Sequence, residues 1–180
     1  MRFLRLAVSL LSLAAVGDVR AQTPRVPDIE AQRAAMKKLG FLVGRWSGEA
    51  RLFGGSPKPA VVTQTEDAQY KLDGLLLVIE GVGRGQTDGK PMLQAFGVIS
   101  YDDEARTYRM RAYNDGRYLE TNVRLADDGK GLMWGFALGP YKSATVLRIN
   151  EAGDWTEHAE LTVGSQSARP LMDLVVKRER

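Results

Sequence analysis

Turn signals that recur at short, regular intervals are the feature that most limits how this 180-residue chain can fold. They are Asp73-Gly74, Asp88-Gly89, Asp102-Asp103-Glu104, Asp115-Gly116, Asp127-Asp128-Gly129, Glu151-Ala152-Gly153 and Gly164-Ser165. An Asp-Gly pair between two alternating segments is a strong signal for a β-hairpin. No interval between the turns has room for the crossover helix that parallel strands would need. The chain is therefore predicted to fold as an antiparallel meander.

The intervals between the turns predict ten strands. We place them at residues 45–53, 60–72, 75–83, 92–101, 106–114, 117–126, 131–138, 141–150, 154–163 and 170–178. A meander leaves two exposed edge strands unless it closes on itself. We therefore predict an all-β fold, a ten-stranded antiparallel up-and-down β-barrel with a short N-terminal helix.

Residues 1–21 have the pattern of a secretory signal peptide. Arg2 and Arg5 provide a basic start, residues 6–16 are apolar, and residues 19–21 offer small side chains near a cleavage site. The apolar run is too short to span a bilayer of about 30 Å stably, although a retained membrane anchor is the alternative. We expect the protein to be exported and to be periplasmic or secreted after removal of this segment.

The rest of the chain reads as a leader at residues 22–27 and one domain at residues 28–180. Loss of the signal peptide removes three arginines and one aspartate, so the net charge of +3 falls to about +1. This balance gives no reason to expect a nucleic-acid partner, and we expect no transmembrane span in the mature chain. The absence of cysteine excludes disulfides, thiol chemistry and zinc–thiolate sites.

A short helix is predicted before the first strand. Asp28 can cap it, and the helix would run to about Lys38. Its apolar stripe contains Ile29, Met36 and Leu39. Three turns are marginal alone, so we expect this stripe to dock as a lid over one end of the barrel. Gly40 is predicted to end the helix in the left-handed C′ conformation.

The first strand carries a tryptophan between two glycines. Trp46 shares one face of the strand with Gly48, Ala50 and Leu52, as the two-residue period of a strand requires. We predict that Trp46 fills the closed end of the barrel. Gly44 and Gly48 would let neighbouring backbone approach its ring.

The helix that leads into Gly44-x-Trp46-x-Gly48 at the start of a meander resembles the calycin superfamily, which includes the lipocalins and the fatty-acid-binding proteins. The span from Met36 to Arg178 is more similar still to a family of uncharacterised bacterial lipocalin-like proteins. The matching pieces are Phe41-Leu42-Val43-Gly44-Arg45-Trp46-Ser47-Gly48, Tyr70-Lys71-Leu72-Asp73-Gly74, Ile99-Ser100-Tyr101-Asp102 and Trp134-Gly135-Phe136. The resemblance implies a barrel with a cavity for a small apolar ligand. It implies no reaction.

The leading hypothesis is an exported lipocalin-like barrel that binds a small apolar or amphipathic molecule without catalysis. Its partner would be a small lipophilic molecule, held by an inward-facing apolar set. That set is Trp46, Leu52, Tyr70, Leu93, Met110, Trp134 and Phe136. Trp134 and Phe136 either pack in the core or line the cavity.

His158 is the single histidine of the chain. Alternation places it with Thr156 and Glu160, opposite Trp155 and Glu157. If its face lines the cavity, His158 could ligate a haem iron, as in the similar barrels called nitrobindins, which use a late histidine. Otherwise it is a solvated surface histidine. Haem is therefore the alternative cofactor, and the leading hypothesis has none.

The strand at residues 107–114 can be read in two registers. One face carries Tyr108, Met110 and Ala112, and the other carries Thr107, Arg109, Arg111 and Tyr113. If the apolar face points inward, the arginines are solvated. In the opposite register Arg109 and Arg111 enter the barrel and could clamp an anionic head group, as interior arginine and tyrosine do in fatty-acid-binding relatives.

Two carboxylates, Glu66 and Glu80, interrupt strand-like segments. A buried glutamate would need a partner, because an unpaired buried charge costs roughly several kcal/mol. Glu80 is the more conspicuous, since five apolar residues precede it and Gly81 follows. It is either a cavity residue paired with an interior arginine or a surface residue.

No catalytic or metal-binding signature is present. The glycine-rich segment at residues 81–86 lacks the last glycine of a dinucleotide loop, and a single histidine excludes two-histidine zinc motifs. We therefore predict no catalytic residue and no metal site, and an enzyme would need a cluster of perturbed carboxylates in one cleft. The third alternative is a ligand-free structural or interaction barrel. The sequence does not indicate the oligomeric state.

Overall fold

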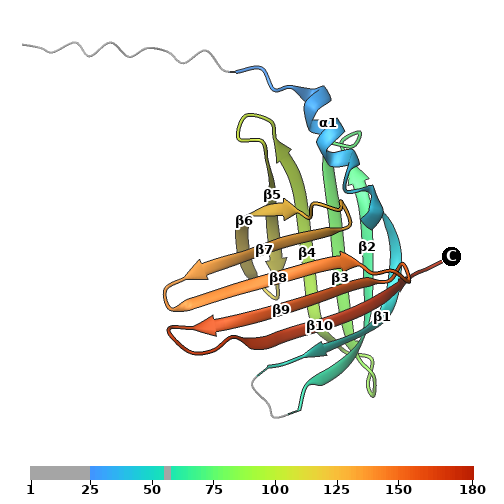
Figure 1. The fold of residues 1–180 in the computed structure, drawn as a ribbon. Helices are drawn as coiled ribbons and strands as arrows, with labels where there is room; N and C mark the ends of the chain where they lie inside the picture. The colour runs from blue at the N-terminus through green and yellow to red at the C-terminus, as the bar shows by residue number, and fades with distance from the viewer. Residues whose placement is uncertain (1–24, 55–57) are drawn as a thin grey trace, which may run out of the picture.

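The computed structural model describes residues 25–54 and 58–180 (Figure 1). The predicted signal peptide at residues 1–21 lies outside the described residues. Of the predicted leader, residues 25–27 are described, and they have no regular secondary structure. No helix within the described ranges is both long and apolar enough to cross a membrane.

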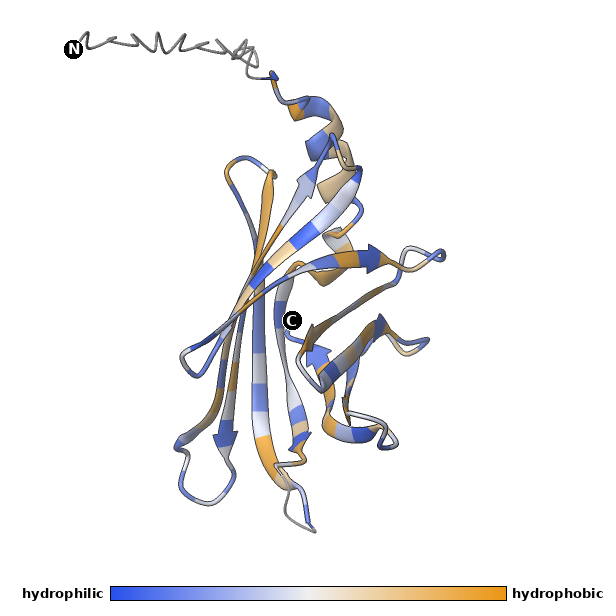
Figure 2. Ribbon diagram, turned by 90° about the vertical axis from the view of Figure 1, so that its left-hand side faces the viewer, coloured by the Kyte–Doolittle hydropathy of each residue, from blue (hydrophilic) through white to orange (hydrophobic). Residues whose placement is uncertain are grey.

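Ten antiparallel strands form a closed barrel, in which each strand pairs with its neighbours in sequence and β1 pairs with β10. The strands are β1 (Gly44–Leu52), β2 (Ala60–Lys71), β3 (Leu76–Gly85), β4 (Pro91–Asp102), β5 (Thr107–Asn114), β6 (Arg117–Leu125), β7 (Gly131–Leu138), β8 (Tyr141–Ile149), β9 (Trp155–Val163) and β10 (Arg169–Arg178). The predicted all-β up-and-down barrel is confirmed, and every predicted strand end lies within two residues of the observed one. Hydrophilic and hydrophobic residues alternate along the strands, as a sheet with one buried face requires (Figure 2).

The extent of pairing between neighbouring strands differs around the barrel. β6 and β7 pair only at Arg124–Met133 and Leu125–Leu132, next to the turn that joins them. Beyond this point the strands diverge, and the Thr121 hydroxyl donates to the Gly135 carbonyl at 2.7 Å across the gap. Strands β7–β10 run steeply across β2–β5 in Figure 1. The wall is therefore split along most of the β6–β7 boundary.

Helix α1 (Ile29–Lys37) lies over one end of the barrel. Met36 is fully buried there, whereas Ile29, predicted to share its stripe, is exposed. Two tyrosines on the barrel strands bind the last turn of the helix: Tyr108 donates to the Ala35 carbonyl at 2.8 Å, and Tyr70 donates to the Met36 carbonyl at 2.7 Å. The predicted lid is thus hydrogen-bonded to the barrel.

The other end of the helix is attached to the turn between β4 and β5. The Asp103 carboxylate accepts from the Gln32 side chain at 2.8 Å, from the Asp28 backbone N–H at 3.0 Å and from Arg25 at 2.6 Å. These donors hold the pKa of Asp103 well below its usual range. Asp28 caps the helix as predicted, accepting from the Ala31 N–H at 3.0 Å.

The prediction that Gly40 takes a left-handed C′ conformation is wrong. Gly40 instead begins a 3₁₀ turn, η1 (Gly40–Leu42), and its φ is not positive. A C′ glycine serves to satisfy the free carbonyls of a helix end. Here the Ala35 and Met36 carbonyls accept the backbone N–H groups of Lys38 and Leu39 at 3.1 and 2.9 Å, and the hydroxyls of Tyr108 and Tyr70 add a second bond to each, so that conformation is not needed.

Trp46 fills the closed end, as predicted, and is 1% exposed. Its indole N–H donates to the Leu42 carbonyl at 2.8 Å, and its ring meets Trp155 edge to face at 5.7 Å. The Arg178 guanidinium lies 4.0 Å from the ring centroid. Gly48 allows a close backbone approach, because a Cβ there would lie 2.2 Å from the carbonyl oxygen of a β10 residue.

Candidate ligand-binding cavity

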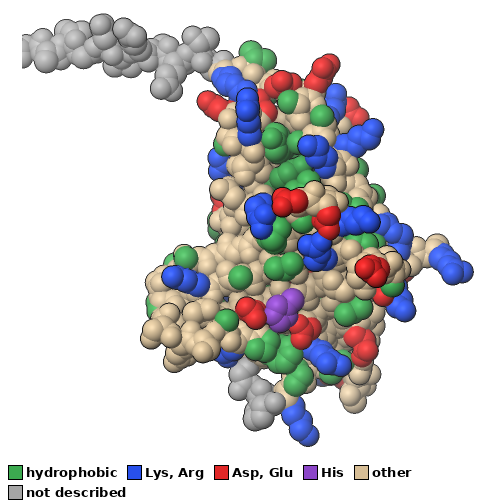
Figure 3. All heavy atoms as spheres, viewed as in Figure 1, with side chains coloured by type: hydrophobic (Ala, Val, Ile, Leu, Met, Phe, Trp, Pro, Cys, Tyr) green, Lys and Arg blue, Asp and Glu red, His purple; other side chains and the backbone are tan. Residues whose placement is uncertain are grey.

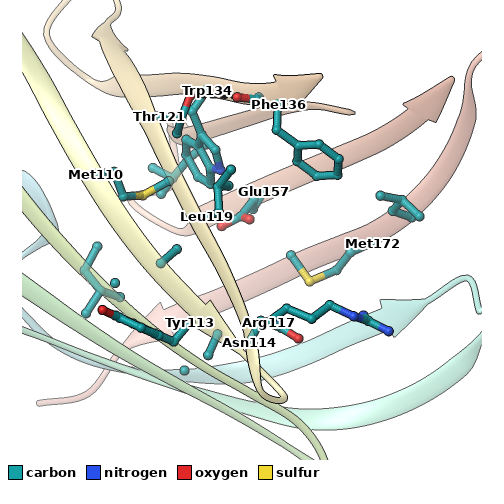
Figure 4. Close-up of a pocket in the computed structure, with 18 of the residues that line it drawn as sticks. Met110, Tyr113, Asn114, Arg117, Leu119, Thr121, Trp134, Phe136, Glu157 and Met172 are labelled. Atoms are coloured by element: carbon teal, nitrogen blue, oxygen red, sulfur yellow. Dashed lines mark hydrogen bonds between the residues drawn. The ribbon is translucent and has the colours of Figure 1, made fainter. Parts of the chain in front are cut away.

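The barrel encloses a cavity of about 1440 Å³ towards the end away from α1. Its walls are mainly apolar and come from nearly every strand (Figure 4). Apolar side chains on the lining include Leu93, Met110, Leu119, Trp134, Phe136 and Met172. Such a lining removes the apolar part of a ligand from water, but it discriminates only weakly between apolar ligands of different shape.

Polar side chains occur at the inner end of the cavity, on β2 and β9. Gln64 and Glu66 both point inward from β2, and they are 1% and 8% exposed. The Gln64 amide donates to Glu66 Oε1 at 2.7 Å. Glu66 Oε2 has no hydrogen-bond or ion-pair partner in the described ranges.

Two glycines on β3 make room for these side chains. Glu66 faces Gly81 across the strand pair, and Gln64 faces Gly83. A Cβ at Gly81 would lie 2.7 Å from Glu66 Oε2, and one at Gly83 would lie 2.6 Å from Gln64 Oε1. Larger residues would therefore displace the polar side chains from these positions.

Glu157 reaches the same cavity from β9. Strand alternation turns it inward together with Trp155, and its carboxyl borders the cavity (Figure 4). Burial and, to a smaller extent, repulsion by the nearby Glu66 carboxylate together raise the pKa of Glu157 to about 8. Burial likewise raises the pKa of Glu66 to about 7, against a smaller lowering by the Gln64 hydrogen bond. Two carboxyl groups thus share one poorly solvated space.

Two buried polar atoms beside this pair are unpaired within the described part of the chain. They are Gln64 Oε1 and the indole N–H of Trp155. The Trp155 N–H is near enough to Glu157 to lower the pKa of that carboxyl slightly, but its geometry is not that of a hydrogen bond. Unpaired buried polar atoms are rare, and they are expected where a ligand or water completes the site.

The cavity mouth carries an exposed apolar rim. Its members are Tyr113, Tyr118, Phe136, Leu138 and Tyr141, all on the cavity lining and all more than a third exposed. The rings of Tyr113 and Tyr118 lie 5.3 Å apart. Arg117 follows a turn at this rim and is the one basic side chain on the lining among the described residues.

Of the site residues predicted from sequence, Tyr113, Trp134 and Phe136 line the cavity. Trp46 and Tyr70 lie beneath it, in the packed region under the helix. Trp134 therefore takes the cavity-lining alternative, with its ring labelled in Figure 4.

Arg109 and Arg111 lie on the outer surface of β5, so the register with the apolar face inward is the observed one. Met110 is buried between them. Arg109 pairs with Asp102 at 2.8 Å, and Arg111 pairs with Glu120 at 3.5 Å. The predicted alternative in which these arginines clamp an anion inside the barrel is wrong, because Met110 and its face neighbours occupy the interior.

His158 and Glu80 are also on the outer surface. His158 contacts Asp173 at 2.5 Å and Glu160 at 3.1 Å, and it is visible between acidic side chains in Figure 3. These two carboxylates raise the pKa of His158. Glu80 is exposed on β3, and the next residue, Gly81, points inward instead. Neither side chain lines the cavity, so the interior position considered for each is not observed.

Glu157 is not among the site residues predicted from the sequence. Its inward position could have been predicted from strand alternation, because Glu157 lies between Trp155 and Ala159 on one face and both of these residues are buried. His158, the neighbouring residue predicted as a possible ligand because histidine can titrate and bind metals, lies on the opposite face of the strand. Glu66 was noted, but nothing in the sequence indicated that it would meet a second carboxyl.

Comparisons with known proteins add information on the fold. No protein-family model matches the chain, and no curated protein matches it. A solved structure described as the crystal structure of Rv2717c from M. tuberculosis is similar, with a TM-score of 0.61 at 13% sequence identity. The match covers 81% of this chain and 98% of that chain. At this identity the likeness shows the barrel fold alone.

Proposed function

We propose that this protein is an exported, lipocalin-like barrel that binds a bulky apolar or amphipathic small molecule. The observation that carries the proposal is the hollow interior of about 1440 Å³ with apolar walls. Known small-molecule sites are typically about 300–1,000 Å³, so this interior has room for a substantial ligand. Export is proposed from the signal-peptide pattern at residues 1–21, and the calycin-type relationship from the helix, Gly-x-Trp motif and meander.

The split between β6 and β7 and the apolar rim support a route for the ligand. Residues on both sides of the split line the cavity, including Leu119, Thr121, Trp134 and Phe136. The exposed rings and Leu138 at the rim offer a lipophile apolar contact on its way into the cavity. Strands that pair only near their turn can separate further at little cost in hydrogen bonds.

Binding of Nile red, an uncharged lipophilic dye, tests this proposal. A cavity-filling variant, Gly97→Leu, projects a side chain into the cavity from a site where an added Cβ meets nothing closer than 4.0 Å. We expect wild-type protein to bind the dye and Gly97→Leu to bind at least about tenfold more weakly, a change of about 1.4 kcal/mol.

The matched control is Gln94→Leu, on the exposed face of the same strand. It adds apolar surface outside the barrel and should leave the affinity for the dye unchanged. Equal binding by Gly97→Leu and wild type, with both folded by circular dichroism, would contradict binding inside the barrel.

A second candidate function is acid–base catalysis on the bound molecule. The pairing of Glu66 and Glu157 in one cavity, with pKa values near neutrality, is the carboxylate cluster that an enzyme would require. The probe is nitrobenzisoxazole, whose ring opens when a desolvated base removes its carbon-bound proton. A faster reaction that is lost in both Glu66→Gln and Glu157→Gln would support catalytic capacity, and a rate equal to that of acetate would exclude it.

A further inference from the structure

We propose that the ligand carries an amine, held as an ammonium between Glu66 and Glu157 at the inner end of the cavity. This inference rests on the proposed binding function and names its ligand class. It combines the two inward carboxyl groups, the unpaired polar atoms beside them and the position of the basic residues of the barrel.

The side chains at the inner end of the cavity favour a positively charged ligand group. Within the described ranges, the side chains at the inner end supply acceptors from Glu66, Glu157 and Gln64, with no lysine or arginine among them. Arg109 and Arg111 are paired with carboxylates on the outer surface. A ligand carboxylate or phosphate placed here would face two acidic groups without a cation, which is unfavourable in a poorly solvated space.

The same side chains offer hydrogen-bond acceptors to a ligand. An ammonium group has three donors and no acceptor. Glu66 Oε2 and the Glu157 carboxyl line the cavity and have no hydrogen-bond partner in the described structure. A primary amine can donate to both carboxyl groups at once, whereas an alcohol has a single donor.

Aromatic side chains beside the carboxyl groups also favour a cation. Trp155 and Trp134 both line the cavity, and Trp155 is next but one to Glu157 on the same face of β9. Aromatic rings attract cations through their electron-rich faces, most strongly where water is excluded. The Trp155 N–H remains available to a carboxylate oxygen of Glu157 once that group is ionised by its new partner.

The raised pKa values of the two glutamates agree with this assignment. They arise from desolvation of both carboxyl groups and, for Glu157, from repulsion by Glu66, and a cationic ligand would favour the charged form of each. The apolar remainder of the ligand would lie along Leu93, Met110 and Met172 towards the rim. The expected ligand class is therefore a lipophilic amine.

Decylamine, decanol and decanoate, compared at neutral pH as competitors of Nile red, test the inference. They share one alkyl chain and differ in the polar end. We expect decylamine to displace the dye at a concentration at least about tenfold below that of decanol, and decanoate to be the weakest. In Glu66→Gln and Glu157→Gln, decylamine should lose this advantage while decanol is unchanged.

Glu80→Gln is the matched control, because it removes one carboxylate from the outer face of the neighbouring strand β3. It should keep the full preference for decylamine. An equal loss in Glu80→Gln would indicate general attraction of a cation to the protein and would overturn the inference. Equal displacement by decanol or stronger displacement by decanoate would overturn it while leaving the binding function intact.

Failure of the binding function itself has a different signature. In that case Nile red does not bind, and none of the three decyl compounds changes the fluorescence of Trp134 and Trp155 in a direct titration. That result rejects the cavity as a binding site and the amine assignment with it.

Discussion

The inward carboxyl groups of Glu66, which is 8% exposed, and of Glu157, which is partly buried, are the least expected groups in this molecule. An apolar barrel core is stable without them, and burying a charge without a partner is costly. β3 nevertheless has glycine at both positions that face Gln64 and Glu66, which leaves space for polar side chains where apolar ones would pack well. Their raised pKa values show that the fold lowers the cost partly by favouring the protonated state.

Stability should therefore depend on pH through these two groups. Both carboxyls have folded pKa values, about 7 and about 8, above the ordinary 4.5. Between these limits the folded protein binds more protons than the unfolded chain, so the free energy of unfolding falls as pH rises from about 4.5 to about 8. The loss is on the order of a few kcal/mol.

Urea unfolding at several pH values measures this dependence. Glu157→Gln should reduce the slope across the whole window and nearly abolish it between about 7 and about 8, because glutamine does not titrate and Glu66 contributes only up to about 7. Glu80→Gln, with its side chain outside, serves as the control and should retain the slope. A wild-type stability that increases steadily across the window would contradict the buried position of the pair.

His158 should play no part in ligand binding, because it lies outside the barrel in contact with Asp173 and Glu160. We expect His158→Ala to bind Nile red with unchanged affinity, and haemin titration to show no Soret change that depends on this residue. Since the pKa of His158 is raised, any stabilisation by its ion pairs is present at low pH and is lost as pH rises through the folded pKa. A histidine-dependent Soret band would revive the haem alternative.

At the level of elements, the attachment of α1 explains how a short helix stays in place. Its last turn lacks the usual glycine termination and is instead bound by hydroxyls from two strands, Tyr70 on β2 and Tyr108 on β5. Its first turn is bound by Asp103 at the β4–β5 turn. The helix therefore closes the barrel end through contacts that only the assembled sheet can offer.

Tyr108→Phe tests the importance of this attachment. The change removes the hydroxyl that binds the Ala35 carbonyl and leaves the ring in place, so we expect a loss of about 1 kcal/mol in the free energy of unfolding. Tyr118→Phe is the control, because the Tyr118 hydroxyl binds Glu120 at the exposed rim and contributes little. Chemical denaturation of the three proteins gives both values, and equal stabilities would show that the lid contributes no hydrogen-bond stabilisation.

At the level of the whole molecule, one side of the barrel has continuous strand pairing and the other side has a gap between β6 and β7. β2, β3 and β4 pair along almost their full lengths, whereas β6 and β7 pair only beside their turn. The cavity lies where the wall is split, and the packed core of Trp46 and Leu42 lies at the opposite, closed end. The fully paired strands β2–β4 thus stabilise the barrel, whereas the β6–β7 boundary gives access to its interior.

Hydrogen exchange should report this division. Backbone N–H groups of residues 117–123 and 134–138 that point into the gap have no ladder partner across it. We expect them to exchange at least about a hundredfold faster than those in the β2–β3 ladder. A ligand that bridges the split should slow them. Uniform protection around the barrel would mean that the gap is closed in solution.

The strands, their turns and the closure of the barrel could be predicted from the sequence, because the two-residue period and the Asp-Gly signals are local properties of the chain. The same alternation indicated which face of each strand is buried and placed Trp46 at the closed end. It could not show that Glu66 on β2 and Glu157 on β9 would enter one cavity, since their meeting depends on the shear and curvature of the closed sheet. Nor could it show the β6–β7 split or the tyrosine-bound helix end, because both depend on how strands distant in sequence are spaced around the barrel.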